Sequence, residues 1–266
     1  MTTHTRPPVV MVFAGVDPTN GAGTGADMEA IRAAGGWALT VPTALTVQDT
    51  SNVARVEPVS ADYIRAAAQC AMADITPDAF KIGLVSSIES MEAIAALIAE
   101  YPSIPVAIDP VLKAGGGAEL SSAELMAAFR SLLLPLATII TPNRLELSRL
   151  VPEESTDNDR ARSLYDRGCS VLLTGTDPLD GEHVSEVVEH SLYRSDHAPV
   201  RWQWPRLSWH YHGSGCTLTS RLALELAQGT PIERACELAQ SSAWLALNSA
   251  YEIGKGQLMP HRLYPD

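Results

Sequence analysis

Two glycine-rich stretches contain residue types that could surround a phosphate group. The first is residues 21–26, Gly-Ala-Gly-Thr-Gly-Ala, which satisfies the relaxed G-x-G-x-x-G/A pattern of a dinucleotide site. The second is residues 212–216, His-Gly-Ser-Gly-Cys, directly before a strongly apolar helical pattern. At such a helix start the backbone N–H groups of residues 213–216 would converge on one point, and the helix dipole would attract an anion. This arrangement suits a phosphoryl group in transfer.

Cys216 stands in the first turn of that predicted helix. A thiol at a helix N-terminus is expected to have a lowered pKa, so Cys216 could act as a base or as a thiolate-like acceptor. The alternative is a tight turn with a buried, inert cysteine, which is the commoner fate of a free cysteine. Taken in isolation, the residues favour the alternative.

Asn143 and Glu146 are spaced three residues apart at the start of another predicted helix and therefore share a face. Their amide and carboxylate could hold a hydrated Mg²⁺, which keeps several waters and needs few protein ligands. The simpler interpretation is a capping box with Asn143 at the N-cap, and the spacing alone favours it.

Three further polar residues come directly after, or lie within, apolar strand patterns. Asp109 ends one such run before Pro110 and should face a cleft, because an unpaired buried charge is costly. Gln48 could pair with the edge of a heterocycle, or it could be a solvated loop amide. Lys81 could bind phosphate, or its long stem could carry the ammonium to the surface.

The region 177–210 is polar, histidine-rich and β-like. Its histidines are not accompanied by a Cys or carboxylate pattern typical of a metal site, so a polar surface flap is expected. The tryptophans near its end should serve packing or an oligomer contact. These histidines are His183, His190 and His197, and the tryptophans are Trp202, Trp204 and Trp209.

The elements that must position these residues alternate between short apolar strands and amphipathic helices. The pattern predicts one α/β domain over residues 1–266, with a mostly parallel central sheet, helices on both faces and a flexible segment at 1–8. In such a sheet ligands bind beyond the carboxyl ends of the strands, where the polar residues stand. The expected strands are 9–16, 37–50, 79–85, 104–112, 138–143 and 170–176, and the expected helices are 24–36, 60–75, 87–101, 121–137, 144–151, 214–229 and 231–252.

Composition narrows the functional classes. The 266 residues carry a formal net charge of −12, which argues against a nucleic-acid or anionic-membrane surface but allows a local anion site. No apolar span is long enough for a membrane helix or a signal peptide. The four cysteines are widely spaced, as in reduced proteins of the cytoplasm. We therefore expect a cytoplasmic enzyme with a small-molecule substrate.

Several motifs occur together in the order typical of one family. They are AGVDPTNGAGTGAD, TALTVQDT, KIGLV, IDPVL, LLPLATIITPNRLE and HGSGCTLTS. This ordered set resembles the hydroxymethylpyrimidine/phosphomethylpyrimidine kinases, thiamine-biosynthesis enzymes of the ribokinase-like fold. The resemblance extends from residue 9 to about residue 250 and is weakest in 177–210. It implies an α/β kinase that uses ATP and Mg²⁺, and we expect a homodimer.

The resemblance also implies roles for individual residues. A pyrimidine pocket would be bordered by Gly15, Asp17, Gly21, Gly23, Gln48 and Leu84, with Gln48 bonding the aminopyrimidine ring. The nucleotide phosphates and Mg²⁺ would be organised by Asp109, Asn143 and Glu146. The catalytic anion hole would be Gly213, Ser214, Gly215 and Cys216, where the cysteine takes the place of the aspartate base of sugar kinases. Two positions depart from the family pattern: Ser214 replaces a threonine, and Thr174 stands where a lysine is usual, among the nucleotide-binding residues.

Other functions remain open at this level. A pyridoxal- or hydroxyethylthiazole-type kinase shares the fold, a non-catalytic pyrimidine-binding module would explain the missing lysine, and a Rossmann oxidoreductase would explain residues 21–26. Four residues separate the first strand from Gly21, whereas a dinucleotide site places its first glycine almost directly after the strand. Asp49, the best candidate for a ribose-binding acid, fits a loop beside Gln48. The early glycines are therefore better suited to bringing the backbone close to a flat ring.

Overall fold

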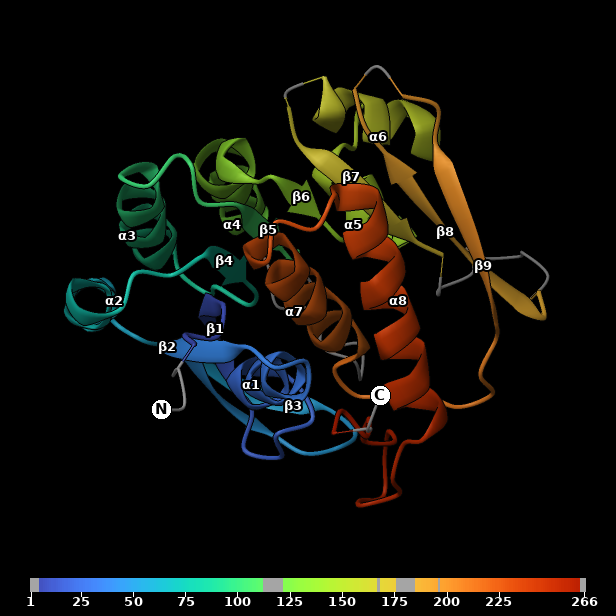
Figure 1. Ribbon diagram of the computed structural model, residues 1–266, viewed down its shortest axis with the longest axis horizontal. Coiled ribbons are helices and arrows are strands. Elements are labelled where there is room, and N and C mark those ends of the chain that lie inside the picture. The colour runs from blue at the N-terminus through green and yellow to red at the C-terminus, as the bar shows by residue number, and fades with distance from the viewer. Residues whose placement is uncertain (1–4, 112–121, 167, 176–184, 196, 264–266) are drawn as a thin grey trace.

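The computed structural model describes residues 5–111, 122–166, 168–175, 185–195 and 197–263, which form an α/β domain around a single sheet (Figure 1). The described strands follow the order β3-β2-β1-β4-β5-β6-β7-β8-β9. Their bounds are β1 Val9–Val16, β2 Trp37–Gln48, β3 Val53–Pro58, β4 Ala79–Ile82, β5 Val106–Ile108, β6 Ile139–Ile140, β7 Ser170–Thr174, β8 Val187–Tyr193 and β9 Val200–Pro205.

The centre of the sheet is parallel. Strands β2, β1, β4, β5, β6 and β7 pair in parallel, whereas β3 pairs antiparallel with β2, and β8 and β9 continue the opposite edge as antiparallel strands. The predicted mostly parallel sheet is confirmed. Because the carboxyl ends of the parallel strands meet at one edge, the residues that follow them are brought together there.

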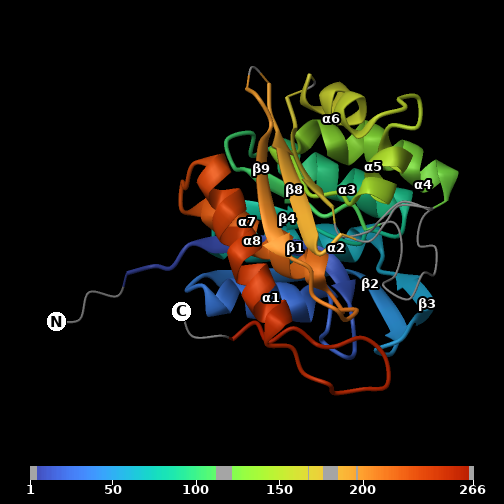
Figure 2. The same cartoon turned by 90° about the vertical axis from the view of Figure 1, so that its right-hand side faces the viewer.

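Helices cover both faces of the sheet, as predicted (Figure 2). One layer contains α1, α7 and α8, and the other contains α2 to α6. No helix of the described ranges has both the length and the apolar character that crossing a membrane would need. The bounds are α1 Gly23–Ala33, α2 Ala61–Asp74, α3 Ile88–Ala99, α4 Ala123–Ala128, α5 Arg144–Leu150, α6 Asp157–Tyr165, α7 Ser214–Ala227 and α8 Ile232–Asn248.

Strand β1 shows why its sequence is apolar at every position. Val10 and Val12 face the core under α1, α7 and α8, whereas Met11 and Phe13 face the core on the other side. All four side chains are completely buried. A strand covered on both faces has no solvent side, so its sequence lacks the alternation of polar and apolar residues.

Side chains cap most of the helices that follow the strands. Ser60, Ser87, Ser122 and Thr156 each accept a hydrogen bond from the backbone N–H three residues further on. Helices α1, α7 and α8 have no side-chain cap, and the N-cap residue of α7 is Gly213.

Two elements were not expected from the sequence. Strand β3 is a short, half-exposed edge strand, and helix α6 is rich in charged residues, so neither shows a strong apolar period. The helix predicted for 121–137 is divided: α4 is followed by a π-helical turn η1, Phe129–Leu133, and a 3₁₀ turn η2, Leu134–Leu136, that contains Pro135.

The expected surface flap at 177–210 is wrong for the residues described there. Strands β8 and β9 extend the main sheet, and Leu192 lies in the core under α8. Trp204 donates to Gln240 of α8 at 3.1 Å and stacks on Trp244, so packing is the role of this tryptophan, while Trp209 is exposed. His183 and the other residues of 176–184, as well as residues 1–4 of the expected flexible segment, lie outside the described residues.

Candidate active site

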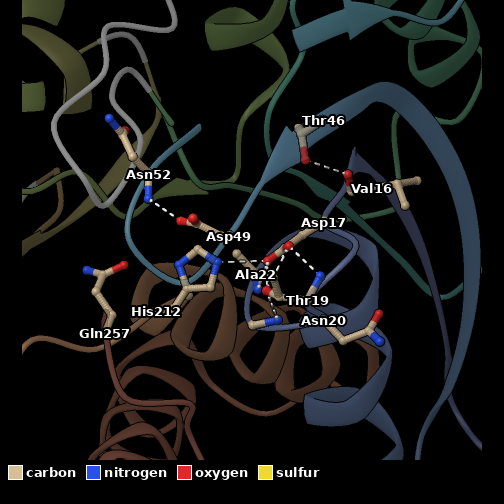
Figure 3. A network of polar contacts seen from close by, with 12 residues as sticks. Val16, Asp17, Thr19, Asn20, Ala22, Thr46, Asp49, Asn52, His212 and Gln257 are labelled. Atoms are coloured by element: carbon tan, nitrogen blue, oxygen red, sulfur yellow. Dashed lines mark hydrogen bonds and ion pairs between the residues drawn. The ribbon is translucent and has the colours of Figure 1, made fainter. Parts of the chain in front are cut away.

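The loop after β1 is organised around the Asp17 carboxylate (Figure 3). Oδ1 accepts hydrogen bonds from the backbone N–H and the hydroxyl of Thr19, both at 2.8 Å, and Oδ2 accepts from the backbone N–H of Ala22 at 2.8 Å. His212 Nε2 lies 2.8 Å from Oδ2. An ionised carboxylate only accepts, so this nitrogen carries its hydrogen. Asp17 therefore folds residues 17–22 into a fixed loop.

The pKa of Asp17 reflects these contacts. Burial alone would raise it, but the hydrogen bonds from His212, Gln48 and Thr19 outweigh burial and hold the pKa far below the usual range. The carboxylate is thus ionised throughout the physiological range. Because its oxygens already accept hydrogen bonds from the protein, Asp17 would act on the predicted pyrimidine pocket by holding the neighbouring residues in place.

The two glycine-rich stretches pack against each other. A Cβ on Gly213 would lie 2.0 Å from the carbonyl oxygen of Gly21, and a Cβ on Gly21 would lie 2.1 Å from Cδ2 of His212. Gly213 also has φ of +69°, which L-residues rarely adopt. Gly23 has φ of +60° and lies against the carbonyl of Gly15. Glycine is required here so that two backbone segments, almost two hundred residues apart in sequence, can touch.

Helix α7 begins at this contact and presents its first turn to the same edge. Since no side chain caps Gly213, the N–H groups of Ser214 and Gly215 are not used by a cap. Asp109 follows β5 and lies directly beside the turn: a Cβ on Gly215 would be 3.0 Å from its Oδ2. The structure therefore brings the predicted catalytic turn, the predicted substrate loop and Asp109 together.

The expected low pKa of Cys216 is wrong. Burial raises the pKa of its thiol to about 12, and although Lys81 lowers it, Asp27 and Asp109 oppose that effect. The sequence argument considered only the helix N-terminus, whereas the buried surroundings dominate. Cys216 is a neutral, buried thiol that donates a hydrogen bond to Asp109.

A buried ion pair lies beneath Asp109 and Cys216. Lys81 Nζ is 2.9 Å from both carboxylate oxygens of Asp27, and neither side chain has any exposed surface. Ser220 of α7 donates to Oδ1 of Asp27 at 2.7 Å. Both suggestions for Lys81, phosphate binding and a stem that reaches the surface, are therefore wrong. Burial would lower the pKa of Lys81, but Asp27, Cys216 and Asp109 raise it above the usual value.

The pKa of Asp109 is raised to about 6. Burial is the main cause and the charge of Asp27 adds to it, while Lys81 and the hydrogen bond from Cys216 work in the opposite direction. Asp109 was predicted to face a cleft, but it is almost completely buried, with only 5% of the residue exposed. Lys81 supplies the positive charge that lets a carboxylate lie this deep.

Two further predicted pocket residues lie on this edge. Leu84 packs its side chain 3.1 Å from the position of a Cβ on Gly15, and its carbonyl accepts from the Thr43 hydroxyl. Gln48 ends β2 and is half-buried, so it is not a freely solvated amide. Asp49, next to it, accepts from the N–H groups of Ser51 and Asn52 at 2.7 and 3.0 Å and closes the turn to β3 (Figure 3).

Asn143 and Glu146 form the capping box that the spacing favoured. Asn143 Oδ1 accepts from the N–H of Glu146 at 2.8 Å, and Glu146 Oε2 accepts from the N–H of Asn143 at 2.9 Å. A backbone bridge joins Asn143 to Thr174 at the end of β7. These three residues therefore occupy the same edge of the sheet, beyond β6 and β7, two to three strands from β4.

Comparison with known proteins identifies the family. The sequence matches the family model described as phosphomethylpyrimidine kinase over residues 17–261. The chain belongs to the phosphomethylpyrimidine kinase family. The expected family and ribokinase-like fold are thereby confirmed, and the dinucleotide interpretation of residues 21–26 is withdrawn.

Individual relatives agree with this assignment. The chain is 34% identical over 253 residues to the thiamine biosynthesis bifunctional protein ThiED of Geobacter sulfurreducens, covering 93% of this chain but only 50% of that protein. It is 31% identical over 253 residues to the hydroxymethylpyrimidine/phosphomethylpyrimidine kinase of Haemophilus influenzae, covering 93% of both. The crystal structure of an ADP complex of Bacillus subtilis pyridoxal kinase has a TM-score of 0.85 and 27% identity, covering 96% of this chain and 97% of that one.

Membership of a kinase family supports the use of ATP. The side chains at this edge can also be compared with the Mg²⁺ that the resemblance implies. Within the described ranges, no three His, Cys, Asp or Glu side chains are grouped closely enough to enclose a metal. Mg²⁺ does not need such a cage, because waters and nucleotide phosphates complete its shell. The oxygen donors of Asp109, Asn143 and Glu146 are of the correct class. Thr174 is buried with its hydroxyl 3.4 Å from the Pro142 carbonyl, so it supplies no cation in place of the family lysine.

Sequence reasoning missed two residues of this kinase-family site. His212 enters the sequence analysis only as the first residue of the glycine-rich stretch 212–216, yet it joins Asp17 to the α7 turn. Arg262 gave no signal, because it stands alone near the end of the sequence. Its contacts with the Asn20 and Gly21 carbonyls and with Thr217 appear only in the folded chain.

Proposed function

We propose that the protein transfers a phosphoryl group from ATP to hydroxymethylpyrimidine, to its monophosphate, or to both, in thiamine biosynthesis. The observation that carries this proposal is the start of α7: a helix N-terminus without a side-chain cap, held against the substrate loop and beside Asp109. Family membership supports the same chemistry. The relatives that bear the matching names provide the choice of substrate.

The α7 turn would supply the anion hole. Backbone N–H groups of Gly213, Ser214 and Gly215 would donate to the oxygens of the transferred group, and the helix dipole would add to their effect. Cys216 would assist deprotonation of the attacking hydroxyl, and its hydrogen bond to Asp109 gives the thiol proton a carboxylate to move to. Because the thiol is neutral, this step differs from proton abstraction by a preformed thiolate.

The pyrimidine would lie against the loop after β1. Gly15, Gly21 and Gly23 let this loop pack closely on the rest of the chain, so that the loop would form one wall of the pocket. Leu84 would provide an apolar contact for a flat ring. Gln48 would present donor and acceptor atoms to the ring edge, with Asp17 holding its surroundings in place.

ATP and Mg²⁺ would occupy the edge beyond β5, β6 and β7. Asp109, Asn143 and Glu146 would hold the cation directly or through water, and Thr174 would border the nucleotide. When bound, the cation neutralises charge on the nucleotide phosphates. The residues of this chain would fix its position and keep bulk water away from the reacting oxygens.

A direct assay tests the proposal. Purified protein would be given ATP and Mg²⁺ with hydroxymethylpyrimidine, with its monophosphate and with pyridoxal, and both ADP and phosphorylated product would be measured. Cys216→Ala should reduce turnover about 100-fold or more, whereas Cys70→Ala, at an exposed cysteine, serves as the matched control. A folded protein that phosphorylates neither pyrimidine would overturn the proposal; pyrimidine binding without turnover would instead support a binding module.

Pyridoxal phosphorylation is the second candidate. It is favoured by the TM-score of 0.85 to Bacillus subtilis pyridoxal kinase, over nearly the full length of both chains. Side-by-side kcat/KM values for pyridoxal and the pyrimidine alcohol, at one ATP concentration, distinguish the two functions. A hydroxyethylthiazole assay under the same conditions tests the other kinase activity that the sequence left open.

We further propose that the protein works in the cytoplasm as a homodimer. The four cysteines are all free, which suits a reducing compartment. Sedimentation velocity measures the oligomeric state: a monomer at micromolar concentration would contradict the dimer. Fractionation of cells into cytoplasmic and membrane pools tests the location.

A further inference from the structure

Arg262, beyond the last helix, contacts both halves of the candidate active site. Its Nε donates to the Thr217 hydroxyl at 2.8 Å, in the first turn of α7 and one residue after Cys216. Its terminal nitrogens donate to the carbonyls of Asn20 and Gly21 in the substrate loop and to Glu29 of α1. The residue is only 7% exposed. One guanidinium therefore links three segments that meet at the site.

The residues before Arg262 continue this link. Gln257 N–H donates to the Thr50 carbonyl at 2.8 Å, and Gly256 N–H donates to the Thr50 hydroxyl at 3.0 Å, just beyond Gln48. Leu258 exchanges backbone hydrogen bonds with the segment leading to the anion hole: its carbonyl accepts from His212 N–H at 2.9 Å. We name residues 256–262 the C-terminal clamp. In Figure 2 the chain after α8 crosses the lower end of the molecule, below α1.

The clamp thus contacts three backbone segments around the proposed pyrimidine site, though not the segment that carries Leu84. These are the turn after Gln48, the loop after β1, and the turn before Cys216. Figure 3 shows Gln257 beside His212 and the Asp17 network. Met259 adds an apolar contact, since a Cβ on Gly21 would lie 2.6 Å from its Sδ. These hydrogen bonds of Arg262 join Thr217, Asn20, Gly21 and Glu29, which lie away from the strand ends at β6 and β7, where the nucleotide would lie.

We infer that Arg262 is a positioning residue that sets the separation between the pyrimidine loop and the anion-hole turn. The kinetic effects expected of this inference rest on the proposed function. The contacts of Arg262 themselves do not depend on which substrate is bound. An arginine suits this task because its planar fork carries five donors in fixed directions. A lysine keeps the charge but cannot reach Thr217, the Gly21 carbonyl and Glu29 with one ammonium.

The consequence should appear on the pyrimidine side of the reaction. If the two loops separate slightly, the attacking hydroxyl loses its alignment with the transferred group, and a misplacement of about 1 Å costs on the order of 100-fold in rate. ATP binding should be nearly unchanged, because its proposed site lies elsewhere on the sheet edge. ATP would then be hydrolysed by water more often relative to transfer.

Arg262→Lys is the main test, and Arg262→Met is the second variant. We expect kcat to fall roughly 10- to 100-fold and KM for the pyrimidine to rise, with KM for ATP within about twofold. The ratio of phosphorylated pyrimidine to ADP should also fall. The matched control is Arg221→Lys, since Arg221 is a mostly buried arginine of α7 that pairs with Glu225. Its product ratio should stay at the wild-type value.

A merely structural role would give a different pattern. Partial unfolding lowers product and ADP in proportion to the folded fraction and leaves both KM values unchanged, and that result would overturn the inference. Hydrogen exchange supplies a readout without substrate: Arg262→Lys should accelerate exchange in peptides covering residues 17–27 and 210–220, while Arg221→Lys should not affect 17–27. If wild-type protein phosphorylates no pyrimidine, the proposed function fails, and hydrogen exchange alone tests whether Arg262 positions the two loops. Unchanged exchange in both peptides would refute the positioning role of Arg262.

Discussion

Replacing Lys81 by methionine should strongly destabilise the fold, although the two side chains are similar in size. Lys81 Nζ contacts both oxygens of Asp27 at 2.9 Å with no solvent access to either side chain. Lys81→Met preserves most of the apolar stem but leaves the Asp27 carboxylate buried without its cation. Removing one partner of a buried ion pair costs about 3–5 kcal/mol. For a chain of this size, that corresponds to a decrease in Tm of roughly 6–20 °C.

The second mutation separates charge from packing. In Lys81→Met/Asp27→Asn the pair is replaced by neutral groups, and the asparagine oxygen can still accept from Ser220, whose hydroxyl lies 2.7 Å from Oδ1 of Asp27. Because an amide needs no cation, the double variant should be more stable than Lys81→Met alone. We expect an interaction energy of about 2–3 kcal/mol between the two sites.

Urea unfolding followed by circular dichroism gives both free energies, and calorimetry gives Tm. Arg65→Met is the matched control, because Arg65 and Asp62 form an ion pair on the exposed surface. Pairs of that kind contribute little, so the control should unfold like the wild type. The reasoning would be refuted if Lys81→Met cost less than about 1 kcal/mol or if Asp27→Asn gave no relief.

Three further predictions concern the site. Gly213→Ala must place a Cβ 2.0 Å from the Gly21 carbonyl at φ of +69°, so activity should be lost and stability should fall by roughly 2–5 kcal/mol, measured by turnover and urea unfolding; wild-type kcat would contradict it. Iodoacetamide at neutral pH should label exposed Cys70 well before Cys216, whose pKa is raised to about 12, as mass spectrometry of timed samples can check, and rapid labelling of Cys216 would refute the neutral thiol. Because the pKa of Asp17 is lower in the folded protein than in the unfolded chain, its stabilisation is present above about pH 4 and lost as pH falls further; Asp17→Asn should flatten the acid limb of the stability curve, and an unchanged limb would argue against this assignment.

Much of the fold could be predicted because apolar runs and helical periods are properties of local sequence. The continuous run of β1 predicted a strand buried on both faces, and that is what the two cores show. Strand β3 and helix α6 were not predicted, because polar contacts hold them at the surface. Thr156 caps α6, and Arg144 and Arg160 both pair with its first residue, Asp157.

Within the candidate site, a local contact was predictable where it depends on spacing alone. The Asn143 and Glu146 capping box needs only a spacing of three. The pKa of Cys216 was not predictable in this way. Its helix position favours the thiolate, but burial beside Asp27 and Asp109 decides the outcome, and those neighbours come from distant segments.

The early glycines show where a motif stops being informative. A G-x-G-x-x-G pattern states that a backbone must turn tightly or be approached closely, but it does not state what approaches. In this chain the partner of Gly21 is Gly213, together with the His212 ring, and the partner of Gly23 is the Gly15 carbonyl. The glycines are therefore explained by the contact between the two loops before any ligand is considered. The proposed anion site lies on the α7 side of that contact, where no side chain caps the helix and Asp109 lies beside Gly215. The role of residues 21–26 therefore depends on their contact with residues 212–216. That contact is visible only in the folded chain.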